Sequence, residues 1–357
     1  MADLETTVIG GVDCHLETHH AVALDTHGRR LGDQSFPTTS HGYHQLLAWL
    51  QHFGHVHAVG VESTASYGAG LTRYLVGAGL TVIEVNQPHR QVRRRRGKTD
   101  ALDAEGAARS VLAGEATAVP KDTTGSVEAI RQLRLARASA VKARTAALTQ
   151  LGEVLATAPA ALRERLSGHA SLHARATRCA RLRADQARLQ QPLEAAKFVL
   201  RSLSQRILAL DAEIARFDAH LATLVASVAP RTTALLGVGT LTAAQLLITI
   251  GQNAARMGDE AAFAHLCGVA PIPASSGKTN RHRLNIGGDR QANAALYLIA
   301  VCRLRYCART RAYAARRTHD GRSKRDTLRC LKRYIAREVF HTLRADLAAL
   351  TAQPAPA

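Results

Sequence analysis

Short apolar runs separated by polar turns occupy the first part of the chain, and they predict three strands in succession. TVIGGVD (7–13) and HAVALDT (20–26) have the apolar density of buried strands. A turn at His27 and Gly28 then leads to a third run in RRLGDQSFP. Three consecutive strands joined by such short connections predict an antiparallel meander.

The pattern then alternates between helical and strand periods. HGYHQLLAWLQHF has apolar residues at helical spacing, HAVGVES has the pattern of a strand, YGAGLTRYLVGAG that of a helix, and TVIEVN that of a strand. A further helix is expected from about Thr99 to Leu112. Three strands followed by helix, strand, helix, strand and helix fit an α/β fold of the ribonuclease H-like class.

Long helices are predicted from about residue 126 to residue 228, where Ala, Leu, Arg and Glu dominate. The last helix carries an apolar seam with alternating steps of three and four residues, as in a coiled coil. The seam consists of Leu200, Leu203, Ile207, Leu210, Ile214, Phe217, Leu221, Leu224 and Val228. Its partner is either the 126–156 segment of the same chain or a second subunit, and periodicity alone does not choose between them.

A glycine-punctuated, basic and mainly helical region begins after Pro230. Its opening LLGVGTLTAAQLL (235–247) resembles a helix-hairpin-helix, whose turn amides bind a DNA phosphate. We therefore expect an N-terminal domain, a central coiled-coil region, a C-terminal domain and a flexible tail. Their expected ranges are 1–125, 126–229, 230–345 and 346–357.

Charge narrows the class of partner. The 47 Lys and Arg exceed the 28 Asp and Glu, which gives a formal net charge of +19. Such an excess favours a phosphate-rich partner, and nucleic acid is the leading candidate. The six cysteines have no CxxC spacing, so neither a zinc site nor a disulfide framework is predicted. No apolar run has the length of a membrane span and no targeting segment is recognised, so we expect a soluble protein.

Four acids are expected to meet in the N-terminal domain. Asp13 follows the first strand, Glu62 ends the fourth, and Asp100 and Asp103 lie one turn apart on a helix. These positions converge in a ribonuclease H-like sheet, and His15 is close enough in sequence to approach them. Clustered carboxylates repel one another unless cations bind, and oxygen ligands favour Mg²⁺ or Mn²⁺. Such a metal beside arginines suits phosphoryl transfer.

Two serines, Ser275 and Ser276, precede Gly277 in a loop that follows two prolines. Four cations surround them in sequence: Lys278, Arg281, Arg283 and Arg290. Nearby cations favour both a serine alkoxide and the charged phosphate that it would attack. Taken alone, however, Ser-Ser-Gly is typical of an ordinary loop.

Five motifs occur in the order found in the IS one-ten family of insertion-sequence transposases, also called DEDD transposases, whose relatives include Piv-like DNA invertases. These motifs are GVDCH, VGVEST, GKTDALDA, LLGVGTLTAAQLL and CGVAPIPASSGKTNRHRLNIGGDRQANAAL. The resemblance covers roughly residues 8 to 305. It implies a RuvC-like domain and a C-terminal transposase domain with a serine nucleophile, matched by Ser276 with Ser275 as the alternative. The implied acidic quartet is Asp13, Glu62, Asp100 and Asp103.

The resemblance also implies an activity and partners. Serine attack would cut DNA, a phosphoserine link would conserve the bond, and the strands would be rejoined with divalent-metal assistance. A structured noncoding bridge RNA would pair with donor and target DNA, leaving the protein mainly backbone contacts. A homo-oligomer, either a dimer or a dimer of dimers, in the bacterial cytoplasm at the nucleoid is further implied. The expected nucleic-acid-binding residues are Arg93, Arg94, Arg95, Arg96, Lys98, Lys278, Arg281, Arg283 and Arg290.

Four alternatives stay open at this point. A RuvC-like junction nuclease would use metal-activated water, and a Piv-like invertase would recombine specific sites. An actin-like kinase is suggested by GGVD, although CHLET follows where that class has glycine and Ser or Thr. A noncatalytic binding protein would bind nucleic acid without metal and leave strands intact.

Overall fold

The computed structural model describes residues 6–86, 97, 99–167, 171–279 and 281–351. The chain forms two compact units, each assembled from separate stretches of sequence. One unit contains Met1–Glu128, Thr249–Arg290 and Arg333–Ala357, and the other contains Ala129–Ile248 and Gln291–Lys332. Each unit is described by itself below.

A five-stranded mixed sheet forms the centre of the first unit. Its strands are β1 (Thr7–Cys14), β2 (Thr18–Asp25), β3 (Arg30–Pro37), β4 (His55–Glu62) and β5 (Val82–Val85). Their order is β3-β2-β1-β4-β5; β1, β2 and β3 pair antiparallel, whereas β4 pairs parallel with both β1 and β5. The predicted meander is confirmed, and the mixed sheet is consistent with the expected ribonuclease H-like class.

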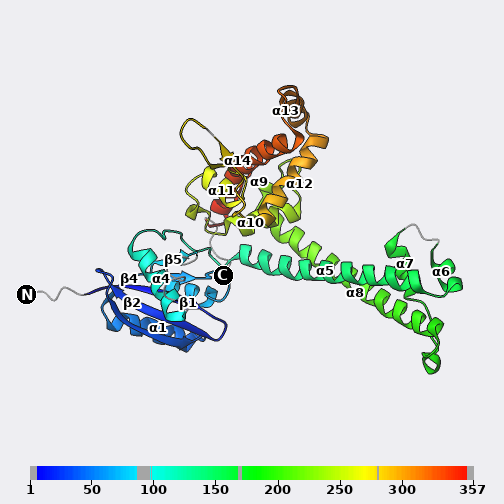
Figure 1. Cartoon of the computed structure of the whole chain (residues 1–357), viewed down its shortest axis with the longest axis horizontal. Coiled ribbons are helices and arrows are strands. Elements are labelled where there is room, and N and C mark those ends of the chain that lie inside the picture. The colour runs from blue at the N-terminus through cyan, green and yellow to red at the C-terminus, as the bar shows by residue number, and fades with distance from the viewer. Residues whose placement is uncertain (1–5, 87–96, 98, 168–170, 280, 352–357) are drawn as a thin grey trace, which may run out of the picture. The chain divides into compact units, whose positions relative to one another are not determined.

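Three helices cover the two faces of this sheet (Figure 1). They are α1 (Ser40–His52), α2 (Ala69–Gly77) and α4 (Asp100–Leu112), as the apolar periodicity predicts. On one face, Val8 and Val12 pack with Leu46 and Leu50 of α1. On the other face, the core is smaller and consists of Ile9, Val22, Leu24, Ala104 and Ala108. Helix α4 therefore lies alone against the second face, and its small residues bring it close to the strands.

Glycines at the sheet allow this close approach of α4. A Cβ atom on Gly11 would overlap the backbone of Ala104 and Ala108, and one on Gly60 would lie 2.9 Å from the carbonyl oxygen of Ala107. Real side chains do not tolerate such contacts, so any larger residue displaces the helix. The two glycines thus fix the depth of α4 on the sheet, and with it the position of the acids at the start of that helix.

We expect Gly11→Ala to lower the free energy of unfolding by about 3 kcal/mol, because overpacking against rigid backbone costs on the order of 1–3 kcal/mol. Gly77→Ala is the matched control, since nothing lies within 4 Å of its would-be Cβ at the end of α2. Urea denaturation of both variants measures the difference. Equal stability of Gly11→Ala and the wild type would contradict the close seating of α4.

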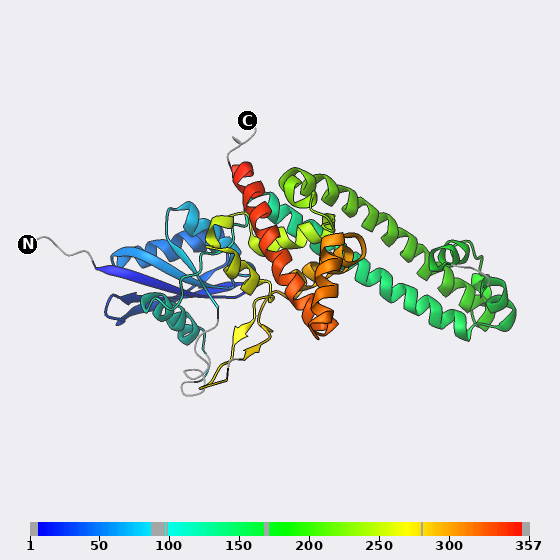
Figure 2. The same cartoon turned by 90° about the horizontal axis from the view of Figure 1, so that it is seen from above.

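Two long helices, α5 (Ser126–Thr157) and α8 (Pro192–Val228), form most of the second unit and run side by side (Figure 2). The Arg137 guanidinium lies 2.6 Å from the Asp218 carboxylate, and Arg144 pairs with Asp211. Rising numbers along α5 thus meet falling numbers along α8, so the helices are antiparallel. The hairpin within one chain, one of the two partners that the seam left open, is present.

The seam of α8 is buried unevenly. Leu200 and Ile207 belong to a core shared with Leu151 and Leu155 of α5. Further along α8, three seam residues are only half-buried: Leu210, Ile214 and Phe217. The hairpin therefore covers the ends of the seam more completely than its middle.

Short elements complete the two units. Between α5 and α8 lie α6 (Ala160–Ser167), α7 (Leu172–Cys179) and the 3₁₀ turn η1 (Gln186–Arg188). After α8 come α9 (Pro230–Thr233), α10 (Thr240–Ile250), η2 (Ala254–Arg256), α11 (Glu260–Leu266), β6 (Ile272–Pro273), β7 (His282–Arg283), α12 (Arg290–Tyr306), α13 (Ala308–His319) and α14 (Lys324–Thr351). Among the described residues, no helix combines the length and the apolar character that a bilayer span requires.

Two details near the C-terminal region differ from, or refine, the sequence expectations. The segment resembling a helix-hairpin-helix has only the four-residue α9 ahead of its turn, where Gly237 has a φ of 85° and the Arg303 guanidinium donates to the carbonyl oxygen of Leu236. Helix α14 continues into the stretch from 346 expected as a flexible tail, because Leu343 and Leu347 occupy one buried face of the helix.

Candidate metal centre and serine loop

Strand periodicity directs Asp13 toward helix α4. Successive residues of a strand point to opposite faces of the sheet. Val8 and Val12 contribute to the core under α1, whereas Ile9 packs on the α4 side and Gly11 touches α4. Asp13 continues the second set, so its carboxylate emerges on the α4 side near the end of β1, where it is 6% exposed.

Glu62 reaches the same edge of the sheet on the neighbouring strand. Strands β1 and β4 are parallel, and Val12 is paired with Val61, so Asp13 and Glu62 follow at matching positions. Both acids influence Cys14 between them: burial is the main reason why the pKa of Cys14 is raised, and the charges of Asp13 and Glu62 raise it further. The two strand-end acids therefore lie close together.

Helix α4 supplies the other two acids, and Thr99 determines where it begins. The Thr99 side chain accepts a hydrogen bond from the backbone N–H of Leu102, which is the usual N-cap arrangement. The cap places Asp100 and Asp103 in the first turn, where the helix dipole favours negative charge. Asp103 is buried at 2% exposure, whereas Asp100 is exposed.

His15 lies between two of the acids. Its Nε2 atom is 3.2 Å from Oδ2 of Asp13 and 3.3 Å from Oδ1 of Asp100. Ligand atoms of these three residues all lie within 4.8 Å of one another, a spacing that suits one metal ion. Sequence reasoning noted only that His15 follows Asp13 closely; the spacing of two residues, which keeps both side chains on one face of a strand, is the signal for its position.

The electrostatics of this cluster favour a bound cation. Burial raises the pKa of Asp13; His15 lowers it, and Asp103 and Asp100 raise it again. Oδ2 of Asp13 and Nε2 of His15 are buried and make no hydrogen bond with the described residues. A divalent ion would satisfy both atoms and offset the repulsion between the carboxylates. The residues present therefore fit a metal site.

The two candidate serines lie in a separate element, the hairpin of β6 and β7. Ile272 pairs with Arg283 and Pro273 with His282. Near its tip, the backbone N–H of Ser276 donates to the carbonyl oxygen of Thr279 at 3.1 Å, and the N–H of Thr279 returns the bond at 3.0 Å. Gly277 between them has a φ of 55°, which two-residue hairpin turns require at their first position.

The hydroxyl groups of the two serines have different surroundings. Oγ of Ser275 accepts a hydrogen bond from the backbone N–H of Arg281 at 3.2 Å and lies 3.4 Å from the carbonyl oxygen of the same residue. The exposed Ser276 hydroxyl makes no hydrogen bond with the described residues. Ser275 thus helps to hold the hairpin together, while Ser276 presents its hydroxyl at the tip.

The expected nucleic-acid-binding residues divide into two sets. Lys278, Arg281, Arg283 and Arg290 are exposed on or after the hairpin. The basic run of Arg93, Arg94, Arg95 and Arg96, together with Lys98, lies outside the described residues. The described set surrounds the serine loop with positive charge.

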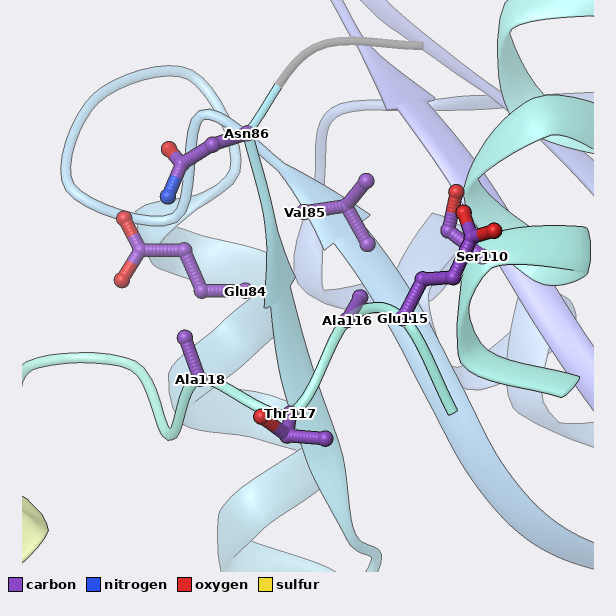
Figure 3. A pocket seen from close by; sticks show the side chains of 8 residues that line it. All are labelled: Glu84, Val85, Asn86, Ser110, Glu115, Ala116, Thr117 and Ala118. Atoms are coloured by element: carbon purple, nitrogen blue, oxygen red, sulfur yellow. The ribbon is translucent and has the colours of Figure 1, made fainter. Parts of the chain in front are cut away.

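A pocket of about 330 Å³ opens elsewhere in the first unit, at the end of β5 (Figure 3). Ser110 and Glu115 lie on one side of it and Glu84 and Asn86 on the other, with Val85 between them. Its lining contains none of the four acids expected to hold metal. The candidate metal centre is therefore distinct from this pocket.

Comparison with known families agrees with both halves of the chain. A transposase model, that of the DEDD domain of IS110 elements, matches residues 10–158. A second model, described as transposase of the IS116/IS110/IS902 family, matches residues 230–315. No curated protein matches the chain. The first match contains the acids and the second contains the serine hairpin, and the chain belongs to the IS110 family of transposases, enzymes that cut and rejoin DNA.

Proposed function

We propose that this transposase cuts and rejoins DNA through a covalent phosphoserine intermediate, with divalent-metal assistance and guidance by an RNA that its element encodes. The observation that carries the proposal is the metal-sized cluster of Asp13, His15 and Asp100 in a chain of the DEDD class. The exposed Ser276 hydroxyl in a basic hairpin supports the covalent step. The RNA guide rests on the family resemblance.

A DEDD-type domain implies the use of a divalent metal, and we assign Mg²⁺ or Mn²⁺ to this site. The proposed ligands are Asp13, Glu62, Asp100 and Asp103, because carboxylate oxygens are the ligands that these ions prefer. When bound, the ion would offset the charge of the scissile phosphate and make its phosphorus more electrophilic. His15 is placed to orient the carboxylates of Asp13 and Asp100.

Ser276 is the proposed nucleophile. Its Oγ would attack a DNA phosphorus, the hydroxyl proton would pass to a base, and the bond to one deoxyribose oxygen would break and leave a strand with a free hydroxyl. Attack by the hydroxyl of another strand would then displace the serine and restore a phosphodiester. Lys278, Arg281 and Arg283 are proposed to hold the attacked phosphate.

We assign the chain to three functional parts: a RuvC-like catalytic part (1–125), a helical part (126–229) and a C-terminal part with the serine (230–345). Arg93, Arg94, Arg95, Arg96 and Lys98 are proposed to bind phosphate beside the acids, and Arg290 beside the serine. Such contacts position a nucleic acid without reading its bases. Sequence choice would then come from pairing between the guide RNA and DNA.

A recombination assay tests the proposed function. Purified protein is mixed with donor and target DNA, in the presence or absence of Mg²⁺ and of the RNA transcribed from beside the gene. We expect joined product only when both are present, and chelation of the metal should remove it. Product without RNA would indicate a Piv-like invertase, and cut DNA without rejoining would indicate a junction nuclease.

We further propose that subunits meet along the middle of α8, where Leu210, Ile214 and Phe217 remain half-buried in one chain. A dimer allows one subunit to supply the serine and another the acids. Leu210→Asp with Phe217→Asp should therefore give folded monomers without recombination activity, measured by light scattering. Ala212→Asp with Ala219→Asp places the same charge on exposed positions of α8 and should leave assembly unchanged. Folded, dimeric Leu210→Asp/Phe217→Asp protein would rule this interface out.

A further inference from the structure

A cationic pocket lies where α6, α7 and the start of α8 meet, in the second unit and outside every site discussed so far. We call it the tip pocket. Its volume is about 790 Å³, and its lining consists of Arg165, Leu166, Arg178, Arg181, Leu182, Arg183 and Lys197. Five of these seven residues are Arg or Lys.

The tip pocket is built on a hydrophobic core. Leu166 and Leu182, which line it, are buried in the same core as Cys179 and Leu200. Ser171 caps α7 by accepting a hydrogen bond from the backbone N–H of Ala174. The cations therefore project from a packed scaffold, which holds them around one hollow.

Hydrogen bonds also fix the segment that carries the pocket into α8. The Asp185 side chain caps the 3₁₀ turn η1 by accepting from the N–H of Ala187. The Glu194 carboxylate accepts from the backbone N–H of Asp185 at 2.7 Å and from Nζ of Lys197 at 2.7 Å. Glu194 thus ties the loop to the first turn of α8 and positions Lys197 at the pocket.

Positive charge at the pocket is poorly compensated. Eight Lys and Arg occur between residues 159 and 197, against three acids, Glu164, Asp185 and Glu194. Lys197 is paired with Glu194, whereas Arg165, Arg181 and Arg183 have no carboxylate partner among the described residues. Like charges around one concavity repel one another, so an anionic ligand would stabilise the arrangement.

A second hollow shares Leu166 with the tip pocket and adds two arginines. It has a volume of about 230 Å³ and is lined in part by Arg163 and Arg175. Nε of Arg175 is buried and makes no hydrogen bond with the described residues. A buried guanidinium nitrogen without an acceptor is costly unless a ligand or water supplies one.

We propose that the tip pocket binds the phosphate backbone of a nucleic acid, and so gives this transposase a contact separate from its acids and serine hairpin. The inference rests on the proposed function only in that the enzyme handles nucleic acid. The lining offers several guanidinium groups for phosphate oxygens and no aromatic side chain for stacking on bases. Backbone binding without base readout follows from that chemistry. RNA and DNA share it, and the test separates them.

The test compares two triple variants of the full chain in the Asp13→Ala background, so that binding is measured without cleavage. Arg165→Ala/Arg181→Ala/Arg183→Ala empties the tip pocket of three charges. Arg188→Ala/Arg201→Ala/Arg206→Ala is the matched control, because it removes the same charge from exposed positions on neighbouring elements. The probes are a labelled RNA hairpin and a DNA duplex of the same sequence, each titrated at several salt concentrations.

We expect the pocket variant to bind at least one probe about tenfold more weakly, with a salt slope smaller by roughly two, because each phosphate contact contributes about 0.9 to the slope on a duplex. The control should stay within about twofold of its parent. The probe that weakens identifies RNA or DNA as the ligand. Equal losses in both variants, or no loss on either probe, would overturn the proposal. Thermal melting confirms folding, and Arg181→Glu alone serves if the triple variant unfolds.

Failure of this test leaves the proposed function standing, since cutting and rejoining depend on the acids and on Ser276. Failure of the recombination assay would likewise leave backbone binding at the tip pocket measurable.

Discussion

Ser276→Ala protein is expected to form no covalent complex with DNA and no recombined product, a loss of at least about a thousandfold, since removing a covalent nucleophile costs on the order of 10³–10⁶ in rate. A serine ester of phosphate conserves the broken bond, because it exchanges one phosphodiester for another of similar free energy. Without the hydroxyl, the free energy of cleavage has no acceptor on the protein. Metal-activated water would at most hydrolyse the strand.

Denaturing electrophoresis with labelled donor DNA, guide RNA and Mg²⁺ measures this loss. Ser275→Ala is the matched control, because its hydroxyl is bonded to the Arg281 backbone in the hairpin. Losing that bond should weaken the hairpin and slow the reaction modestly while the adduct still forms. An adduct that persists in Ser276→Ala and is absent in Ser275→Ala would move the nucleophile by one residue.

Asp13→Ala is expected to abolish strand cleavage while the protein stays folded and binds nucleic acid. The carboxylate sits among Asp100, Asp103 and Glu62, so its loss in metal-free protein removes repulsion and leaves stability unchanged or higher. With metal present, however, the variant lacks a central ligand. We expect a loss of at least about a thousandfold in cleavage, comparable to several kcal/mol of transition-state stabilisation.

A thermal shift separates this role from a structural one. Metal bound only to the folded state raises its stability by RT ln(1 + [L]/Kd), so Mn²⁺ should raise the melting temperature of the wild type and have a much smaller effect on Asp13→Ala. Glu62→Ala, Asp100→Ala and Asp103→Ala should behave alike. Glu153→Gln removes an exposed acid of α5 as a control and should keep the shift. A full Mn²⁺ shift together with full cleavage in Asp13→Ala would exclude this residue as a ligand.

The sheet and the convergence of its acids follow from local patterns in the sequence. Apolar runs of strand length predict β1 to β5, and alternation along β1 directs Asp13 to the side on which α4 packs. Thr99 and the acids behind it are the signature of a helix start, so the register of Asp100 and Asp103 was also predictable. The sequence did not indicate how closely α4 approaches the sheet, because that depends on the contact of Gly11 with Ala104 and Ala108.

Other features depend on contacts between distant residues, which periodicity does not report. The α8 seam fits either a second subunit or a helix of its own chain; the ion pair of Arg137 and Asp218 identifies α5 as a neighbour. The choice between Ser275 and Ser276 needs the hydrogen bonds of the hairpin. The tip pocket escaped notice because its arginines, such as Arg165 and Arg183, are scattered in sequence and gather only through folding.

The metal and serine chemistries separate the transposase reaction from its nearest alternatives. A junction nuclease also needs Asp13 and its neighbours, but it would tolerate loss of Ser276, because water is its nucleophile. A noncatalytic binding protein would lose neither binding nor strand integrity in any of these variants. The acids alone therefore do not distinguish a recombinase from a nuclease, and the serine does.

Peptide mapping of the covalent complex tests the central claim most directly. Wild-type protein is reacted with donor DNA, guide RNA and Mg²⁺, quenched in denaturant, digested with nuclease and protease, and analysed by mass spectrometry. The account predicts a nucleotide attached to Ser276 through a phosphodiester, on the peptide that contains the tip of the β6–β7 hairpin. DNA cleaved in the same reaction with no nucleotide attached to the protein would contradict it.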